Sequence, residues 1–491
     1  MVDDMGFSDV GCYGSEIDTP HIDALALKGL RFSQFYNTGR CCPTRAALLT
    51  GLYQHQAGLG GMVSAKGRGA YLGRLNDRCV TLAEALRTAG YMTAMSGKWH
   101  VGSARKHWPD RRGFDRFYGT PEGGGHHYKM PPGRTLVNDG KAIDVPKGWY
   151  STTAFTDYAV RYIDEAAATE KPLFLYVAYT APHWPLQASD ETIAKFRDRY
   201  RGGWRPIREA RFKRQIELGL FPEGTKLSPH DAKMPKWSTV DHDEMSLRMA
   251  THAAMVHLVD AGIGRIVERL RHHDELDNTL ILFLSDNGAS AESGATGFTG
   301  NRGGDPKART GTPTSYNSFR ISGANTFDTP FRRYKKYAHE GGIATPLIAH
   351  WPNGIPKPQR GQWSRELGHV IDFMPTFLQI AGADYPRRRG DLDTIPLAGR
   401  SLLPALRGGV IERSEGLFFE HMGNAAIRLG QWKLVRARGK PWSLYDMSSD
   451  RTELDDVSKE HPTIAADLKA KWSAWAKRVG VNRRPAKKGK R

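Results

Sequence analysis

Two adjacent cysteines begin the stretch CCPTR at residues 41–45, whose residue types could support nucleophilic chemistry. No second pair of Cys or His residues at zinc spacing lies nearby, and Arg45 is too close to Cys41 for the phosphate loop of a cysteine phosphatase. Pro43 suits the first turn of a helix, so the sequence predicts a helix that ends near Gly51 and carries Cys41 at its N-terminus. Unpaired N–H groups and the helix dipole favour an anion there. The alternative is a pair of buried structural cysteines.

A second group of candidates offers oxygen ligands at the ends of short apolar stretches. Asp3 and Asp4 follow only two residues, and the pair Asp286 and Asn287 follows LILFLS. Ligands of open α/β sheets bind beyond the carboxyl ends of the strands, so these side chains are expected to meet. Three carboxylates and one amide suit Ca²⁺ or Mg²⁺ better than zinc. Each motif alone is typical of a turn or a helix cap, but together they predict a metal site.

The elements that must position these residues alternate along most of the chain. Short apolar runs between stretches of helical periodicity predict an α/β fold with a large, mainly parallel central sheet flanked by helices. Strands are expected within 171–183, 278–288 and 345–352, and helices at 249–273 and 367–382. The stretch 289–330 is rich in Gly, Ser, Thr and Asn and is expected to be a long functional loop.

The sequence changes character after about residue 388. Short strands at 416–422, 425–437 and 442–447 and a closing helix at 462–480 predict a smaller C-terminal α+β domain with an antiparallel sheet. The expected division is therefore a catalytic domain at 1–388, a second domain at 389–480 and a disordered basic tail at 481–491.

Composition narrows the classes of protein further. The net charge of +19 is concentrated partly in the tail and partly in residues 195–215, and it would suit either a polyanionic partner or a solvated basic face. No nucleic-acid-binding module is present, and no apolar run reaches the length of a membrane span. Four cysteines in 491 residues do not form a disulfide scaffold.

The stretch CCPTRAALLTG resembles the signature of the formylglycine-dependent (type I, arylsulfatase-like) sulfatases of the alkaline phosphatase superfamily, Cys-x-Pro-x-Arg followed by Leu-Thr-Gly. Further stretches resemble blocks of the same family in the same order: DDMGFSDVGCYG, GKWHVG, APHWP, SDNG, HEGGIATPLIAHWP and LAGRSLLP. The resemblance covers nearly the whole chain. It implies a sulfuric ester hydrolase in which a maturation enzyme oxidises Cys41 to formylglycine, while Cys42 fills a variable position.

The resemblance also implies a role for each remaining candidate. A hydrated aldehyde at position 41 would present two hydroxyls, one to attack sulfur and one whose deprotonation expels sulfate. His100 would assist that expulsion, Arg45 would hold the diol, Lys98 and Lys335 would bind sulfate oxygens, and His183 would protonate the leaving oxygen. Lys335 is preferred to Lys336 because it stands five residues before Glu340. The implied metal, usually Ca²⁺ and otherwise Mg²⁺, would be held by Asp3, Asp4, Asp286, Asn287 and residue 41.

One departure from the family pattern concerns the start of the chain. Family members have a full hydrophobic strand and an export signal before the Asp-Asp pair, and this chain has only Met1 and Val2 there. The first strand is therefore expected to be missing or truncated in the sequence as given. The resemblance suggests a periplasmic or secreted protein, although no signal peptide is present in this chain.

Three alternatives stay open. A phosphate or phosphonate ester hydrolase would use the same scaffold, and a non-catalytic homologue would bind polyanions through the positive charge. An enzyme that uses the Cys41 thiolate directly would leave the oxygen ligands without a purpose. Within the sulfatase interpretation the substrate is expected to be a sulfated carbohydrate or an aryl sulfate, and the basic, aromatic loops would suit a sulfated carbohydrate.

Overall fold

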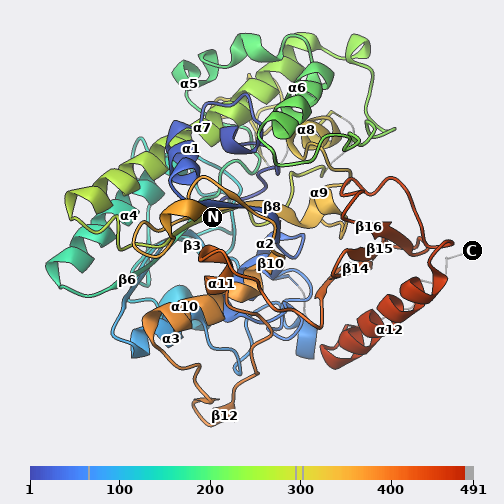
Figure 1. Cartoon of the computed structure of the whole chain (residues 1–491). Helices are drawn as coiled ribbons and strands as arrows, with labels where there is room; N and C mark the ends of the chain where they lie inside the picture. Colours follow the sequence, from blue (N-terminus) through green and yellow to red (C-terminus); the bar gives the residue numbers. More distant parts are fainter. Residues whose placement is uncertain (65–66, 293–295, 301–302, 482–491) are drawn as a thin grey trace, which may run out of the picture.

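A large mixed sheet forms the centre of the computed structural model, which describes residues 1–64, 67–292, 296–300 and 303–481 (Figure 1). The expected tail at 481–491 lies outside these residues except for its first position. One half of the sheet has the strand order β5-β4-β3-β2-β6, in which β3, β2 and β6 run parallel. Its strands are β2 (Met92–Lys98), β3 (Arg116–Thr120), β4 (Leu136–Asn138), β5 (Lys141–Ile143) and β6 (Leu173–Ala178).

The other half has the order β10-β1-β8-β7, and β9 also pairs with β1. Its strands are β1 (Leu30–Tyr36), β7 (Ile281–Leu284), β8 (Ala344–His350), β9 (Trp363–Ser364) and β10 (Gly368–His369). β8 runs antiparallel to both of its neighbours, and every residue of β8 is buried. The expected strands within 171–183, 278–288 and 345–352 are thus β6, β7 and β8.

Residues 1–3 join the two halves. The Val2 N–H donates to the Leu284 carbonyl (3.0 Å), and the Asp3 N–H donates to the Ala181 carbonyl (3.1 Å). Two isolated parallel bridges, Val2 to Ser285 and Asp3 to Pro182, result. This short segment therefore lies where the first strand is expected. It places Asp3 and Asp4 at the carboxyl ends of β6 and β7.

Helices cover both faces of the sheet (Figure 1). On one face lie α1 (Pro20–Leu27), α4 (Ser151–Ala168) and the long α7 (His242–His272), and α7 packs against both of the others. On the other lie α2 (Cys41–Thr50), α3 (Leu82–Thr88) and α10 (Phe373–Ala381). Further short helices are α5 (Asp190–Ala194), α6 (Trp204–Glu217), α8 (Arg320–Phe327), α9 (Glu340–Ile343) and α11 (Leu403–Leu406). The expected fold class is confirmed.

The C-terminal part is a smaller antiparallel sheet with one helix, seen at the right of Figure 1. Its elements are β13 (Leu417–His421), β14 (Asn424–Leu429), β15 (Trp432–Arg436), β16 (Ser443–Asp446) and α12 (Pro462–Arg478). Trp475 of α12 stacks on Phe418 with ring centroids 5.1 Å apart, so helix and sheet share one apolar layer. A two-residue hairpin, β11 (Arg388–Arg389) with β12 (Leu392–Asp393), lies at the expected boundary, and the division at 388 stays a prediction.

Two expectations about local structure are wrong. The helix expected at 367–382 begins only at Phe373, because residues 368–369 pair with β1 and the buried Asp372 carboxylate accepts the His369 N–H (2.8 Å). The loop expected throughout 289–330 contains α8, whose sequence has weak helix formers. Burial of Ala324 and Phe327 stabilises that helix despite its low propensity. No helix in the described part of the chain is both long and apolar enough to cross a membrane.

Candidate active site

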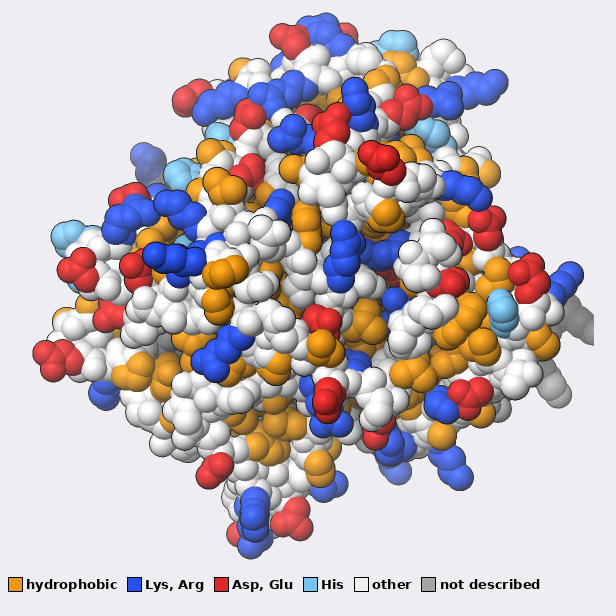
Figure 2. Space-filling view, viewed as in Figure 1, with side chains coloured by type: hydrophobic (Ala, Val, Ile, Leu, Met, Phe, Trp, Pro, Cys, Tyr) orange, Lys and Arg blue, Asp and Glu red, His pale blue; other side chains and the backbone are white. Residues whose placement is uncertain are grey.

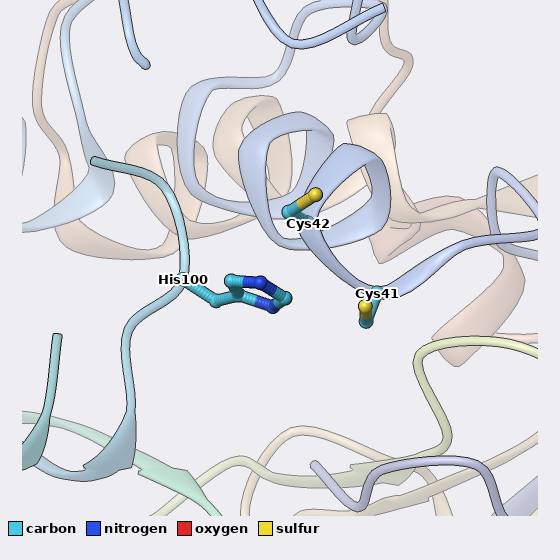
Figure 3. A group of neighbouring side chains, drawn as sticks. All are labelled: Cys41, Cys42 and His100. Atoms are coloured by element: carbon cyan, nitrogen blue, oxygen red, sulfur yellow. The ribbon is translucent and has the colours of Figure 1, made fainter. Parts of the chain in front are cut away.

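The N-terminus of α2 carries the candidate nucleophile. Cys41 is the first helical residue, and Gly51 ends the helix in the left-handed conformation (φ 67°), as the sequence predicts. His100 extends from the segment after β2 toward Cys41 (Figure 3). One ligand atom each from Cys41, Cys42 and His100 lie within 4.8 Å of one another. A hydrogen bond from Cys42, assisted by Lys98 and His100, holds the pKa of the Cys41 thiol well below its usual range despite burial. Position 41 therefore favours a negative charge.

Cys42 faces a different environment. Its Sγ lies 3.5 Å from the Met62 Sδ and 3.8 Å from the Gly61 carbonyl, and burial raises the pKa of its thiol well above the usual range. Cys42 is thus a neutral, packed residue that supports the helix start. The two neighbouring thiols have opposite properties because burial and the hydrogen bond between them raise the pKa of Cys42, whereas the same hydrogen bond, with Lys98 and His100, lowers that of Cys41.

The four oxygen-ligand candidates meet at the carboxyl ends of the strands. The Asp4 N–H donates to the Asp286 Oδ1 (3.3 Å), and the Asn287 Nδ2 donates to the Asp4 Oδ1 (2.7 Å). Two buried oxygens, the Asp3 Oδ1 and the Asn287 Oδ1, have no hydrogen-bond partner among the described residues. Burial and the Asp3 charge raise the pKa of Asp286 to about 8. Orphaned oxygens and mutually repelling carboxylates fit a hard divalent cation such as Ca²⁺ or Mg²⁺.

Each of the three carboxylates pairs with a different buried cationic side chain. The Lys98 Nζ lies 2.6 Å from the Asp3 Oδ2, and the Lys335 Nζ lies 2.6 Å from the Asp4 Oδ1. Arg45 donates from Nε (3.0 Å) and Nη2 (2.7 Å) to the Asp286 Oδ2.

Lys336, the alternative to Lys335, contacts none of the candidate metal ligands in the described part of the chain. It is 37% exposed and pairs with Glu292. The backbone separates the two lysines, because Lys336 adopts a left-handed conformation with φ 82°.

His183 borders the same carboxylates from the segment after β6. Its Nδ1 lies 2.6 Å from the Trp184 carbonyl oxygen, so that nitrogen carries a hydrogen and donates it. Its Nε2 lies 3.4 Å from the Asp4 Oδ2 and is the ring nitrogen that faces the site. The ring is thus oriented with one nitrogen available for proton exchange.

Two site residues hold unusual backbone conformations. Asp4 (φ 65°) and His100 (φ 61°) both lie in the left-handed region, which costs non-glycine residues free energy. Such conformations cluster where function fixes the side-chain direction.

All ten residues predicted from the sequence lie around this one centre, linked by the contacts above. They are Asp3, Asp4, Cys41, Arg45, Lys98, His100, His183, Asp286, Asn287 and Lys335. Three further residues belong to the neighbourhood and were not predicted: Arg40, Glu292 and Asp328. Arg40 directly precedes the CCPTR stretch and could have been flagged, whereas the latter two stand in the stretch 289–330 without a motif.

Comparisons with known proteins agree on one family. A family model described as Sulfatase matches residues 1–383, and one described as N-sulphoglucosamine sulphohydrolase, C-terminal, matches residues 331–478. The chain is 35% identical over 530 residues to an uncharacterized sulfatase of Schizosaccharomyces pombe, covering 98% of this chain and 93% of the relative. It is 34% identical over 421 residues to the arylsulfatase of Klebsiella aerogenes, covering 82% and 90%. A crystal structure of Ps i-CgsB in complex with k-i-k-neocarrahexaose is similar over 97% and 91% of the two chains, with a TM-score of 0.72 and 29% identity.

Proposed function

The chain belongs to the sulfatase family and is a sulfuric ester hydrolase, and from that premise we propose that it acts through a formylglycine made from Cys41, with a divalent cation, on a sulfated carbohydrate or an aryl sulfate. One observation supports this proposal most strongly. Position 41 lies beside two buried lysines, and each lysine pairs with a different carboxylate of one oxygen-ligand set. That arrangement places a position for the nucleophile, a position that binds an anion and a position that binds a cation next to one another.

The groups implied by this proposal supply the reactivity. A formylglycine would supply, as its hydrate, an oxygen nucleophile at position 41, and a cation held by Asp3, Asp4, Asp286 and Asn287 would supply a Lewis acid. Formation of the formylglycine requires the family's maturation enzyme as a partner.

The two lysines bind the sulfate group of the substrate. An ammonium group has three N–H donors, so Lys98 and Lys335 can each keep their carboxylate contact and still donate to sulfate oxygens. Their fixed positions orient the sulfur toward position 41. Arg45 offsets the charge of Asp286, and its Nη1 donates a hydrogen bond to the Lys98 carbonyl (2.8 Å).

The two histidines transfer the protons of the reaction. The Nε2 of His183 faces the site and can hold a proton for the departing oxygen, because the Nδ1 is committed to the Trp184 carbonyl. His100 lies beside position 41 and can accept a proton from that residue. Both roles follow from where the rings lie.

The test is a pair of hydrolysis assays on protein produced together with the maturation enzyme. We expect release of 4-nitrophenol from 4-nitrophenyl sulfate and much slower release from 4-nitrophenyl phosphate. Cys41→Ser should abolish the reaction, and the matched control Cys42→Ser should retain it, because the Cys42 thiol packs against Met62. Faster hydrolysis of the phosphate ester would support the phosphohydrolase alternative, and full activity of the Cys41→Ser variant would rule out the proposed nucleophile.

A further inference from the structure

One carboxylate next to the candidate site gathers three cationic side chains. The Glu292 Oε1 accepts from the Arg40 Nη1 (2.7 Å) and pairs with Lys336, and its Oε2 lies 3.6 Å from the Lys335 Nζ. The Glu292 and Arg40 side chains are only 17% and 12% exposed. Burial raises the pKa of Glu292, but the three cations outweigh it and hold that pKa well below its usual range. An anion is thus strongly stabilised at this position.

The positive charge of this cluster exceeds its negative charge. Lys335 is already matched by Asp4. Arg40 and Lys336 remain, and Glu292 is the one carboxylate that pairs with either of them within the described part of the chain. Two cations therefore share one carboxylate, which leaves a net positive charge directly beside the sulfate-binding lysine.

The backbone holds the two cations close to each other beside position 41. Arg40 immediately precedes Cys41, and the Lys336 N–H donates to the Gly39 carbonyl at 2.7 Å. Lys336 has a left-handed conformation, and its side chain pairs with the Glu292 Oε1, whereas the buried Lys335 approaches the Glu292 Oε2. A strained non-glycine residue that directs a charge into a cluster is typical of a functional position.

The C-terminal sheet contributes a polar side chain to the same region. His421, at the end of β13, is 2% exposed, and neither of its ring nitrogens has a hydrogen-bond partner among the residues described. Its ring lies within electrostatic range of both Arg40 and Cys41. A buried imidazole without a hydrogen-bond partner costs free energy, and such a group indicates a side chain that binds a ligand.

We propose that Arg40 and Lys336 form a second anion subsite, closed by Glu292, which selects substrates that carry a carboxylate or a second sulfate next to the reacting sulfate. This inference rests on the proposed function. Arg40 and Lys335 contact different oxygens of one carboxylate, so the two anionic groups of the substrate must stand on neighbouring atoms. The incoming anion replaces the Glu292 carboxylate on the guanidinium, which can bind it through two N–H groups. His421 then donates to the same anion or to a neighbouring hydroxyl.

The test compares two substrates that differ by one anionic group, phenyl sulfate and 2-carboxyphenyl sulfate. Lys336→Gln should lower kcat/KM for 2-carboxyphenyl sulfate about 10- to 100-fold, mainly through KM, because a hydrogen bond to a charged group is lost. The same change should leave phenyl sulfate within about threefold. Glu292→Gln should act in the opposite direction and raise kcat/KM for 2-carboxyphenyl sulfate, because it removes the internal competitor. Lys213→Gln, an 81% exposed lysine on α6, serves as the matched control and should change neither substrate.

The outcomes separate this inference from the proposed function. Equal losses on both substrates in Lys336→Gln, or a loss in Glu292→Gln on the carboxylated substrate alone, would overturn the subsite, because a merely structural cluster gives those results. Calorimetric binding of both compounds to the wild-type protein gives a second readout that needs no turnover. Tighter binding of the carboxylated compound, lost in Lys336→Gln, supports the subsite even if no sulfate is hydrolysed, and equal affinities contradict it.

Discussion

At the residue scale, the site consists of buried charges that lie in direct contact with charges of the opposite sign. Lys98 pairs with Asp3, Lys335 with Asp4, and the two contacts are 2.6 Å long. Burial lowers the pKa of Lys335, but the negative charges of Asp4, Cys41 and Glu292 together outweigh it and raise that pKa above its ordinary value. Charges arranged in this way need no reorganisation when an anionic substrate binds, which is the main source of electrostatic catalysis.

The role of His183 can be tested with leaving groups of different basicity. His183→Asn should lower kcat/KM by about 10²–10⁴-fold on alkyl sulfates, because an alkoxide needs a proton to leave. On 4-nitrophenyl sulfate the loss should be much smaller, since nitrophenolate leaves without one. Steady-state kinetics on the two substrate types measures the difference. A uniform loss across both would show that His183 only positions the substrate.

The residues of the site differ in how well the sequence could predict them. Asp286 and His183 follow apolar strands in recognisable motifs, and the CCPTR stretch predicts the start of α2, so each could be placed from local pattern alone. Glu292 could not be placed, because it stands in a stretch without periodicity and reaches Arg40 only through the tertiary fold. The choice between Lys335 and Lys336 depends on a backbone torsion angle that no propensity predicts.

At the element scale, the loops after the strands are tied together by one buried side chain. The Asp328 Oδ1 accepts the Phe7 N–H (3.2 Å) and the Ala289 N–H (3.1 Å), and these two residues belong to the loops that carry the candidate metal ligands. Burial, with Asp9 and Asp4 adding to it, raises the pKa of Asp328 well above its usual range. Through its two hydrogen bonds, Asp328 positions both ligand loops.

Removing this link should weaken metal binding. Asp328→Ala should reduce Ca²⁺ affinity about 10- to 100-fold, the usual effect of losing a residue that orients metal ligands. Asp328→Asn keeps an oxygen that can accept both N–H groups, so its affinity should stay within a few fold of the wild type. Calorimetric titration of the metal-free proteins with Ca²⁺ measures both. Equal affinities for all three proteins would show that the two loops are held in place by other contacts.

At the scale of the whole molecule, a buried ion cluster joins the C-terminal sheet to the catalytic part. Lys433 of β15 pairs with Glu340 (2.7 Å) at the start of α9 and with Glu453 (2.9 Å), and Arg451 pairs with Glu340 (2.8 Å). Lys433 and both carboxylates are fully buried. The sequence predicts strands on either side of this junction from their short apolar runs, but it does not predict the pairing, which joins residues 93 positions apart.

Breaking the cluster should destabilise the protein in a pH-dependent way. Lys433→Met leaves two buried carboxylates with one cation and should cost about 3–5 kcal/mol at pH 7, whereas Lys471→Met, which breaks an exposed pair with Asp467, should cost less than about 1 kcal/mol. Burial raises the pKa of Glu340, but Lys433 and Arg451 lower it to about 2, below its ordinary value of 4.5.

The sign of the pH effect follows from that shift. A carboxylate whose folded pKa is lowered adds stability above its ordinary pKa and loses it as the pH falls toward the folded value. The pKa of Glu453 is raised, because burial outweighs Lys433, but Lys433 lowers the pKa of both carboxylates, so its removal acts on both in the same direction. The stability difference between wild type and Lys433→Met should therefore be largest near pH 7 and shrink as the pH falls below about 4.5. Urea unfolding at several pH values measures it, and a difference that grows on acidification would contradict the assignment.

Many basic side chains pair with acids where the structure describes them. In residues 195–215, Arg211 binds Asp9 and Glu16, and other arginines of the segment pair with nearby acids. On the face shown in Figure 2, basic side chains lie among acidic ones, with no broad single-sign patch. The arrangement favours a solvated basic face over a general polyanion-binding surface, and it leaves the cluster around Arg40 as the positive site of interest.

The central claim is that position 41 carries the activated nucleophile, and one measurement tests it directly. Trypsin cleaves after Arg40 and Arg45, so the residue lies in the five-residue peptide 41–45 of protein produced with the maturation enzyme. Mass spectrometry of this peptide should show a loss of about 18 Da located at residue 41, the change from thiol to aldehyde that the proposed nucleophilic chemistry requires. An unmodified thiol at position 41 in protein that still hydrolyses sulfate esters would contradict the account.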